Sequence, residues 1–344
     1  MPLPQRIENL EQLEELLSRP TGPVVELFRR LEGDVVILGA GGKIGPSLTR
    51  MACRARQQAA RGRRIIAVAR FSDSAARAAI EQVGAEVLRA DLMDPAAVAA
   101  LPPAQNVLYL VGQKFGTTHR PDLTWAVNTL VPAAVAQRYR LSRIVAFSTG
   151  CVYPLVPAGS RGSTEADELT PLGEYANACV ARERIFEHAS RRDGTPVVQL
   201  RLNYALELRY GVLVDLARQV LAGEAVDLTM GYFNAVWQGD VNAAALRLLE
   251  HAASPPAAFN VTGPERLSVR QVAAALAARL GRPARFAGQE APTALLADAS
   301  RAIALLGPPM VPIERVIDWT ADWLARGGAT LNKPTHFQQR DGRY

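Results

Sequence analysis

The sequence contains little cysteine, histidine or lysine, and each shortage excludes a class of protein. Its three cysteines, Cys53, Cys151 and Cys179, lie far apart and show neither metal-ligand spacing nor the even number of a disulfide framework. The four histidines show no ligand spacing either, so we expect no metal site. This cysteine usage is typical of a reduced, cytoplasmic protein.

Long apolar runs are also absent. No stretch of about 18 apolar residues occurs, so we expect no membrane span. The acidic, amphipathic N-terminal segment lacks the basic patch and apolar stretch of a signal peptide. With 344 residues, 49% of them hydrophobic, the chain is long enough for one large α/β domain and a smaller lobe.

Lysine is the scarcest charged residue. Only Lys43, Lys114 and Lys333 occur, so arginine carries almost all of the net charge of +6. The basic residues are scattered along the chain, which argues against a dedicated nucleic-acid surface. Their mild positive field favours anionic ligands.

The pattern of apolar residues predicts four segments. Residues 1–30 contain two short helices that form an N-terminal appendage. From Asp34, short apolar strands alternate with alanine-rich helices, as in a parallel sheet covered on both faces. We therefore predict a doubly wound α/β domain of Rossmann type over 31–204, a smaller C-terminal substrate lobe over 205–328, and a polar surface tail over 329–344. The predicted strands of the main domain are Val35–Leu38, Ile65–Ala69, Glu86–Arg89, Val107–Leu110, Ile144–Ser148 and Val197–Arg201.

A glycine-rich turn, Gly39-Ala-Gly-Gly-Lys-Ile-Gly45, follows the first strand and opens a helix. In that context the pattern predicts a dinucleotide site. Gly39 permits the tight turn, Gly42 lets backbone amides approach a pyrophosphate, and Gly45 lets the helix pack closely on the strand. The helix N-terminus supplies partial positive charge for the anion. Lys43 and Ile44, within the turn, are also expected to contact the cofactor.

The end of the second strand favours NADP over NAD. An acidic residue at that place ordinarily binds the 2′-hydroxyl of the ribose, but here Ala69 is followed by Arg70, Phe71 and Ser72. An arginine and a hydroxyl suit a 2′-phosphate. The alternatives are that Arg70 stacks on adenine or is solvated, and that Asp73 restores a preference for NAD.

Asp91 and Leu92 follow the third strand and are expected to contact the adenine. The alternative for Asp91 is to cap the helix that begins near Pro95.

At this point the sequence resembles the extended short-chain dehydrogenase/reductase family, the NAD-dependent epimerase/dehydratases. The similar segments cover about residues 33 to 325 in the family's order. The likeness is carried by the glycine turn, Val-Asn128-Thr, Phe-Ser-Thr-Gly-Cys-Val-Tyr-Pro (147–154), Gly-Glu-Tyr-Ala (173–176), Arg201-Leu-Asn203 and Phe-Asn-Val-Thr-Gly-Pro-Glu-Arg-Leu-Ser-Val (259–269). The resemblance implies that Val111, Asn128 and Asn203 belong to the cofactor site.

The resemblance also implies the catalytic groups. Tyr175 matches the family's general acid/base, while Thr149, with Ser148 beside it, matches the hydroxyl residue that binds the reacting oxygen. The family has a lysine four residues after the tyrosine, which holds the nicotinamide ribose and lowers the pKa of the phenol. Here that residue is Cys179, a mostly uncharged thiol at neutral pH.

The missing lysine leaves three interpretations open. Another cation could do the work, and Lys114 is the candidate, because its loop, Val-Gly-Gln-Lys-Phe, resembles the Gly-x-Lys loop of UDP-galactose 4-epimerases. Alternatively, Tyr175 works at a higher pKa, or the chain is a non-catalytic NAD(P)-binding sensor. A nucleophilic role for Cys179 is less favoured than packing.

The substrate is expected to be small. Nucleotide-sugar members of the family have an arginine that binds the diphosphate, and Phe233 stands at that position here, with Arg209 or Arg218 as possible substitutes. A sugar, sugar acid or lactone is therefore favoured over the alternative, a nucleotide-sugar 4-epimerase. Tyr232, Phe233 and Trp237 are candidates for an apolar wall against the sugar ring, but ordinary core packing is slightly favoured for them. The resemblance further implies a homodimer formed through the helix of Tyr175.

Overall fold

The computed structural model describes residues 3–72, 74–114 and 119–343. Its centre is a seven-stranded sheet in which every neighbouring pair of strands is parallel, in the order β3-β2-β1-β4-β5-β7-β12. This order confirms the predicted doubly wound fold. The strands are β1 (Val35–Leu38), β2 (Ile65–Ala69), β3 (Glu86–Arg89), β4 (Asn106–Tyr109), β5 (Arg143–Thr149), β7 (Val197–Leu202) and β12 (Ala257–Val261).

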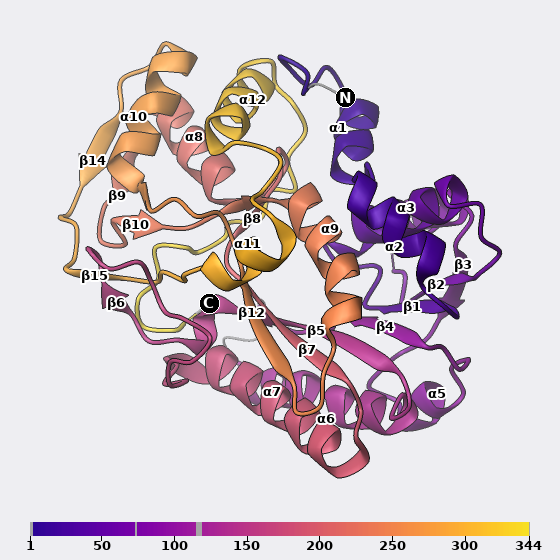
Figure 1. The fold of residues 1–344 in the computed structure, drawn as a ribbon. Helices are drawn as coiled ribbons and strands as arrows, with labels where there is room; N and C mark the ends of the chain where they lie inside the picture. The colour runs from indigo at the N-terminus through magenta and orange to yellow at the C-terminus, as the bar shows by residue number, and fades with distance from the viewer. Residues whose placement is uncertain (1–2, 73, 115–118, 344) are drawn as a thin grey trace.

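Helices cover both faces of the sheet (Figure 1). Alternate residues of β1 point to opposite sides, so Val35 and Ile37 pack in one core cluster, whereas Val36 and Leu38 pack in another. The first cluster lies under α2 (Gly22–Arg30), α3 (Gly45–Gln58), α4 (Ser74–Glu81) and α9 (Gln238–Arg247). The second lies under α5 (Pro95–Ala99), α6 (Pro121–Arg138) and α7 (Gly173–Asp193).

A second lobe has a core of its own. Its buried residues include Phe233, Trp237 and Trp319, and the two indole rings meet edge to face with centroids 5.5 Å apart. The lobe's helices are α8 (Val212–Ala222), α10 (Val269–Leu280) and α12 (Ile313–Ala325), with α11 (Ser300–Leu306) beside β12. Its short strands form the pairs β8–β11 (Ala205–Leu206, Val236–Trp237), β9–β14 (Ala225–Asp227, Arg285–Ala287), β10–β13 (Tyr232–Phe233, Leu267–Ser268) and β6–β15 (Val156–Pro157, Thr293–Ala294). Two short 3₁₀ turns, η1 (Gly150–Val152) and η2 (Leu248–His251), follow β5 and α9.

The N-terminal segment joins the two lobes. Helix α1 (Leu10–Leu17) buries Leu13 and Leu17 in the core of the second lobe, whereas α2 packs on the sheet. The indole of Trp319 donates to the carbonyl of Pro4 over 3.1 Å. Residues 3–30 are therefore part of both cores, and are more than an appendage to the main domain.

The tail was expected to lie along the surface, but part of it is buried in the core of the second lobe. Phe337 is only 4% exposed and packs on Phe233, with ring centroids 6.1 Å apart. Thr335 donates to the Asp215 carboxylate through both its amide and its hydroxyl, over 2.8 and 2.6 Å. Burying a phenylalanine stabilises by about 1.5–3 kcal/mol, and this anchors a segment that has no helix or strand.

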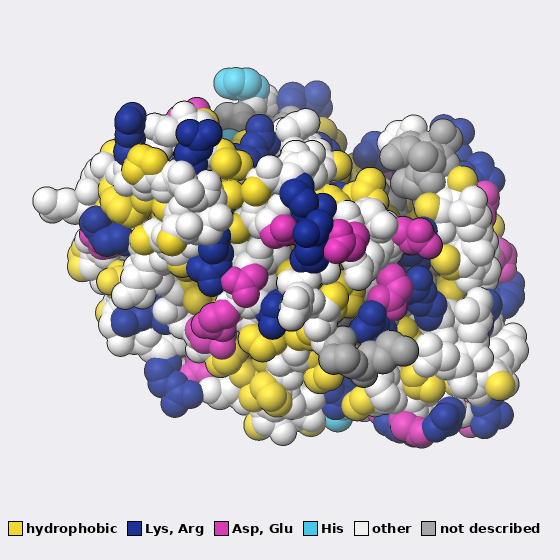
Figure 2. Space-filling view, turned by 90° about the horizontal axis from the view of Figure 1, so that it is seen from above, with side chains coloured by type: hydrophobic (Ala, Val, Ile, Leu, Met, Phe, Trp, Pro, Cys, Tyr) yellow, Lys and Arg dark blue, Asp and Glu magenta, His cyan; other side chains and the backbone are white. Residues whose placement is uncertain are grey.

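The surface mixes charges of both signs. Figure 2 shows Lys and Arg side chains interspersed with Asp and Glu over one face, without a continuous basic stripe. Within the described parts of the chain, no helix combines the length and the apolar character needed to span a bilayer.

Candidate functional site

The glycine turn joins β1 to α3. Gly39 has φ of +86°, a conformation that favours glycine, and its carbonyl accepts from the Gly42 amide over 3.0 Å. A Cβ on Gly45 would lie 2.3 Å from the Ala40 carbonyl oxygen, so only glycine allows α3 to approach the turn this closely. The predicted roles of Gly39 and Gly45 in the turn geometry are consistent with this arrangement.

Residues of this turn line two cavities. The first, which we call the glycine-turn cavity, has a volume of about 310 Å³ and is lined by Gly39, Gly41 and Gly42 together with the carboxyl ends of β2, β3 and β4. The second, the tyrosine cavity, has a volume of about 280 Å³. It begins at Lys43 and Ile44, the next residues of the turn, and also contains Tyr175. The turn therefore contributes lining residues to both cavities.

The glycine-turn cavity collects the residues predicted to bind the adenosine half of a dinucleotide. Arg70, Asp91, Leu92 and Val111 all line it. Arg70 is exposed, and Ser72 also lines this cavity. Asp73, the alternative ribose ligand, lies outside the described residues.

Asp91 does not cap the following helix. Its carboxylate accepts from the Met93 amide over 3.0 Å, and Asp94 is the residue that caps α5, accepting from Ala96 over 2.9 Å. This leaves Asp91 exposed at the cavity.

The tyrosine cavity brings three of the four predicted catalytic side chains together. Thr149 ends β5, Tyr175 lies in the first turn of α7, and Lys114 follows β4. The Lys114 ammonium is 5.7 Å from the centre of the Tyr175 ring. Carboxyl ends of parallel strands meet at one edge of the sheet, and this explains why residues far apart in sequence meet here.

Ser148, the fourth predicted catalytic residue, has its hydroxyl turned into the protein. Although Ser148 lines the cavity, its hydroxyl donates to the Glu183 carboxylate, which is buried and also paired with Arg201 over 2.8 Å. Arg201 in turn donates to the Tyr153 hydroxyl over 2.7 Å. The hydroxyl of Ser148 therefore belongs to a structural network between β5, α7 and β7.

The two predicted asparagines have different surroundings. Asn128 uses both ends of its amide within the protein, donating to the carbonyls of Gln113 and Thr124 and accepting from Arg182. It therefore holds the loop that follows β4. Asn203 is 3% exposed and lines the tyrosine cavity, and its Nδ2 has no hydrogen-bond partner among the described residues.

Tyr175 has a mainly apolar environment. Burial raises the pKa of the Tyr175 phenol well above 10, the neighbouring Cys179 thiol raises it further, and the charge of Arg182 lowers it. Burial likewise raises the pKa of Cys179, which is fully buried. A thiol with a raised pKa is neutral at pH 7, so Cys179 carries no charge beside Tyr175.

Lys43 is a second lysine on the cavity wall. Its ammonium donates to the carbonyl of Ala205 over 3.1 Å and lies 3.9 Å from the ring centre of Tyr210. Burial lowers the pKa of Lys43 to about 7, against an opposing effect of Glu207. Lys43 and Lys114, the two lysines of the main domain, therefore both line the tyrosine cavity.

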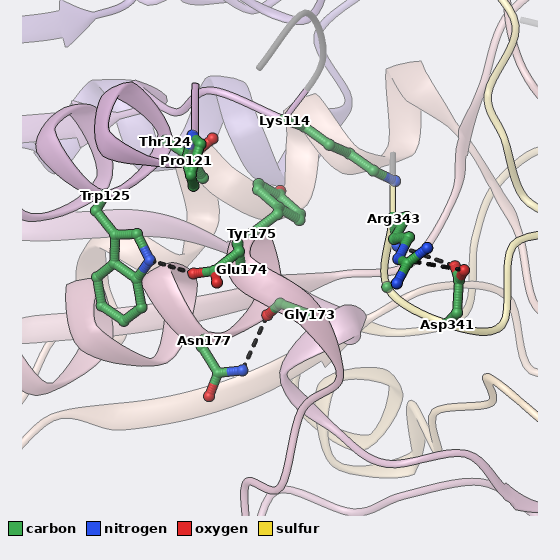
Figure 3. A pocket seen from close by; sticks show the side chains of 11 residues that line it. Lys114, Pro121, Thr124, Trp125, Gly173, Glu174, Tyr175, Asn177, Asp341 and Arg343 are labelled. Carbon is green, nitrogen blue, oxygen red and sulfur yellow. Dashed lines mark hydrogen bonds and ion pairs between the residues drawn. The ribbon is translucent and has the colours of Figure 1, made fainter. Parts of the chain in front are cut away.

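A third cavity of about 600 Å³ meets the tyrosine cavity at Lys114 and Tyr175 (Figure 3). Its walls come from α6, the start of α7 and the tail. Figure 3 shows Trp125 donating to Glu174 on one side and the ion pair of Asp341 with Arg343 on the other. The tail, predicted to be a surface segment, thus forms a wall of the site, and Thr335 lines the tyrosine cavity as well.

Core packing, the favoured interpretation, holds for two of the three aromatic residues considered for a wall against the sugar ring. Phe233 and Trp237 are buried in the second core, and Tyr232 stacks with Arg266, whose guanidinium is 4.9 Å from the ring centre. The aromatic side chains that line the tyrosine cavity with Tyr175 are instead Tyr204 and Tyr210. Their nearness to Arg201-Leu-Asn203 was the signal in the sequence that could have identified them.

Arg182 was also missed. It lies three residues after Cys179 and seven after Tyr175, the spacing of one helix face, and this signal could have found it. Among the described residues, no group of three or more His, Cys, Asp or Glu side chains is arranged to hold a metal ion.

Comparisons with known proteins identify the family and the fold of this chain. The model of the NAD dependent epimerase/dehydratase family matches residues 35–262. The comparison with curated proteins found no sequence that matches this chain. The UDP-glucose 4-epimerase of Thermus thermophilus, solved in complex with NAD, is 24% identical with a TM-score of 0.68 over 86% of this chain and 99% of that chain. DesIV, the dTDP-glucose 4,6-dehydratase of Streptomyces venezuelae, solved with NAD and TYD bound, is 16% identical with a TM-score of 0.72 over 85% of this chain and 97% of that chain.

The family model covers well over half of the chain, and the solved structures share its fold over nearly their whole length. The predicted Rossmann-type fold and the predicted enzyme class are therefore confirmed. This chain belongs to the NAD-dependent epimerase/dehydratase family.

Proposed function

We propose that the protein is an NADP-dependent epimerase/dehydratase or oxidoreductase that acts on a small polyhydroxylated substrate through Tyr175. The observation that carries the proposal is the meeting of Tyr175 and Thr149 in a cavity that adjoins the glycine turn. A sugar, sugar acid or lactone has the hydroxyl-bearing carbon that this pair of side chains suits.

The residues present fit a nicotinamide dinucleotide. The glycine turn leaves room for a pyrophosphate at the start of α3, and the two cavities that the turn lines suit the two nucleotide halves. The orphaned Nδ2 of Asn203 is a buried donor directed to no protein acceptor among the described residues. Lys43 and Ile44 would hold the nicotinamide half. When bound, the nicotinamide supplies the acceptor and donor of hydride.

The chain's own part in the chemistry is to hold the reacting oxygen and move its proton. Thr149 would donate to or accept from the substrate oxygen, and Tyr175 would exchange a proton with it. As the carbon–hydrogen bond gives up hydride, the oxygen–hydrogen bond gives up its proton to the tyrosinate, and a carbonyl forms. Because burial raises the pKa of Tyr175, the tyrosinate that accepts this proton forms readily only if a nearby cation stabilises it.

Arg70 and Ser72 support NADP as the cofactor. Both line the glycine-turn cavity beyond the end of β2, where Ala69 leaves no carboxylate for a ribose 2′-hydroxyl. Solved relatives have NAD bound, so NAD is the alternative. In a fluorescence titration, Arg70→Ala should weaken NADPH at least about tenfold more than NADH, since only NADPH carries the 2′-phosphate. Equal effects on the two cofactors would contradict the assignment.

The walls of the tyrosine cavity support a small substrate. Tyr204, Tyr210 and Thr335 line this cavity, whose volume of about 280 Å³ suits a single sugar ring better than a nucleotide sugar. Phe233, at the place of the family's diphosphate-binding arginine, is fully buried. Of the possible substitutes, Arg209 is paired with Glu14 over 2.7 Å and does not line this cavity.

A substrate panel tests the proposal. Sugars, sugar acids, lactones and UDP-sugars are incubated with the protein and NADP or NAD, and the absorbance of the reduced nicotinamide and the product composition are followed. We expect turnover of a small compound that falls at least about 100-fold in Tyr175→Phe. Turnover of UDP-sugars alone would identify a nucleotide-sugar epimerase instead. Tight cofactor binding with no turnover would favour a sensor.

A further inference from the structure

Arg182 is a buried cation on the helix of the proposed acid/base, and it donates to Cys179, which packs with Tyr175. It is 5% exposed and lies on α7, on the face that carries Tyr175 and Cys179. A charged group at such depth is costly unless hydrogen bonds and nearby charges compensate it. The hydrogen bonds and charged groups around the Arg182 guanidinium therefore indicate the role of its charge.

Among the described residues, three hydrogen bonds fix the guanidinium, and all three go to neutral acceptors. Nη1 donates to the Val111 carbonyl and to Asn128 Oδ1, each over 3.1 Å, and Nη2 donates to Cys179 Sγ over 3.4 Å. Nε has no partner among the described residues. Within the described part of the chain, no carboxylate accepts a hydrogen bond from Arg182.

The nearest acid is already paired. Glu183, the next residue on α7, accepts from Arg201 on β7 and from Ser148 on β5. The groups that feel the charge of Arg182 are Cys179, Tyr175, Tyr109 on β4 and Glu183. The positive charge is thus fixed by the protein and has no hydrogen-bonded counter-ion in the described ranges of the chain.

We propose that Arg182 is the positioning residue that supplies, from behind Cys179, the positive charge that the family's lysine ordinarily provides beside the tyrosine. The inference rests on the proposed function. A guanidinium fits this task because it stays charged even when fully buried. Cys179 is then the small neutral residue that leaves room for the guanidinium and accepts a hydrogen bond from it.

Asn128 and Val111 help to hold the Arg182 guanidinium in place. Their oxygens hold Nη1, and Asn128 donates in turn to the Gln113 carbonyl. The loop that carries Lys114 is therefore tied to the cation. Cys151, on η1, is a further titratable neighbour of Tyr175 and Cys179.

The test measures the phenol itself and needs no substrate. A fluorinated tyrosine, whose phenol is more acidic, is incorporated at position 175 of the full chain, and its ionisation is followed by fluorine NMR against pH. Arg182→Met and Arg182→Lys are compared, because the two side chains have similar length and differ in charge. We expect the midpoint to rise by about one pH unit or more in Arg182→Met, and by clearly less in Arg182→Lys.

A midpoint in Arg182→Met within about 0.3 unit of that in Arg182→Lys, in folded protein, would overturn the proposal. If Arg182→Met does not fold, Asn128→Asp serves in its place. That variant puts a carboxylate against the guanidinium and should also raise the midpoint, and an unchanged midpoint there would equally overturn it. A catalytically inert protein with a shifted midpoint would contradict the proposed function and support the role of Arg182.

Discussion

Replacing Cys179 with lysine, the residue that the family has at this position, should lower the stability of the protein. In Cys179→Lys a second cation enters the buried space beside Tyr175, where Nη2 of Arg182 lies 3.4 Å from the sulfur that is replaced. Two unit charges about 4 Å apart repel by about 4 kcal/mol at an effective dielectric constant of about 20. The new side chain can turn partly toward the tyrosine cavity, so we expect a net loss of about 2–4 kcal/mol of unfolding free energy from charge alone.

The assay is a double-mutant cycle in urea. Cys179→Met is the control, because it adds an unbranched chain without a charge, and overpacking alone costs about 1–3 kcal/mol. Cys179→Lys should be less stable than Cys179→Met when Arg182 is present. The gap should close when Arg182→Met is added to both. Equal stabilities of the two variants with Arg182 in place would refute the reasoning.

Three other changes probe the rest of the site. Glu183→Ala leaves the guanidinium of Arg201 buried without its partner and should cost about 3–5 kcal/mol in urea unfolding, whereas a loss under about 1 kcal/mol would show that the network matters little. Phe337→Ala should cost about 3 kcal/mol and expose the tail to proteolysis, and unchanged cleavage would show that the tail is not anchored there. Because burial lowers the pKa of Lys43 to about 7, its charge is present below that pH and lost above it, so dinucleotide affinity should fall as the pH rises through this value in the parent. Lys43→Met should flatten this dependence, and the same slope in both proteins would contradict the role.

The sequence alone predicts most of the fold. Short apolar runs that alternate with helices leave few arrangements besides a doubly wound parallel sheet. The glycine turn and the ends of β4 and β5 then fall at one edge of the sheet, so the meeting of Thr149, Tyr175 and Lys114 follows from topology.

Side-chain direction explains the outcome for Ser148. Successive residues of a strand point to opposite faces, and on β5 Ile144 and Ala146 pack on the α6–α7 side. Ser148 has the same parity, so its hydroxyl meets Glu183 of α7, whereas Thr149 lines the cavity at the end of the strand. Counting parity along the strand would have predicted this.

Other parts of the site leave no periodic signal. Phe337 lies in an irregular segment, where no helical or strand spacing marks its burial. For Phe233 and Trp237 the sequence leaves a substrate wall and core packing both open, and the second lobe uses their apolar area for its core. Arg182 was overlooked because the family pattern ends four residues after Tyr175, while the helix face continues for another turn.

The most direct measurement of the central claim is a crystal structure of the protein with bound NADP. We predict that the dinucleotide crosses the glycine turn, with its adenosine half against Arg70 and its nicotinamide against Tyr175 and Thr149. The Arg182 guanidinium should keep its hydrogen bond to Cys179. A nicotinamide half that lies outside the tyrosine cavity, or a phenol that turns away from it, would contradict the account.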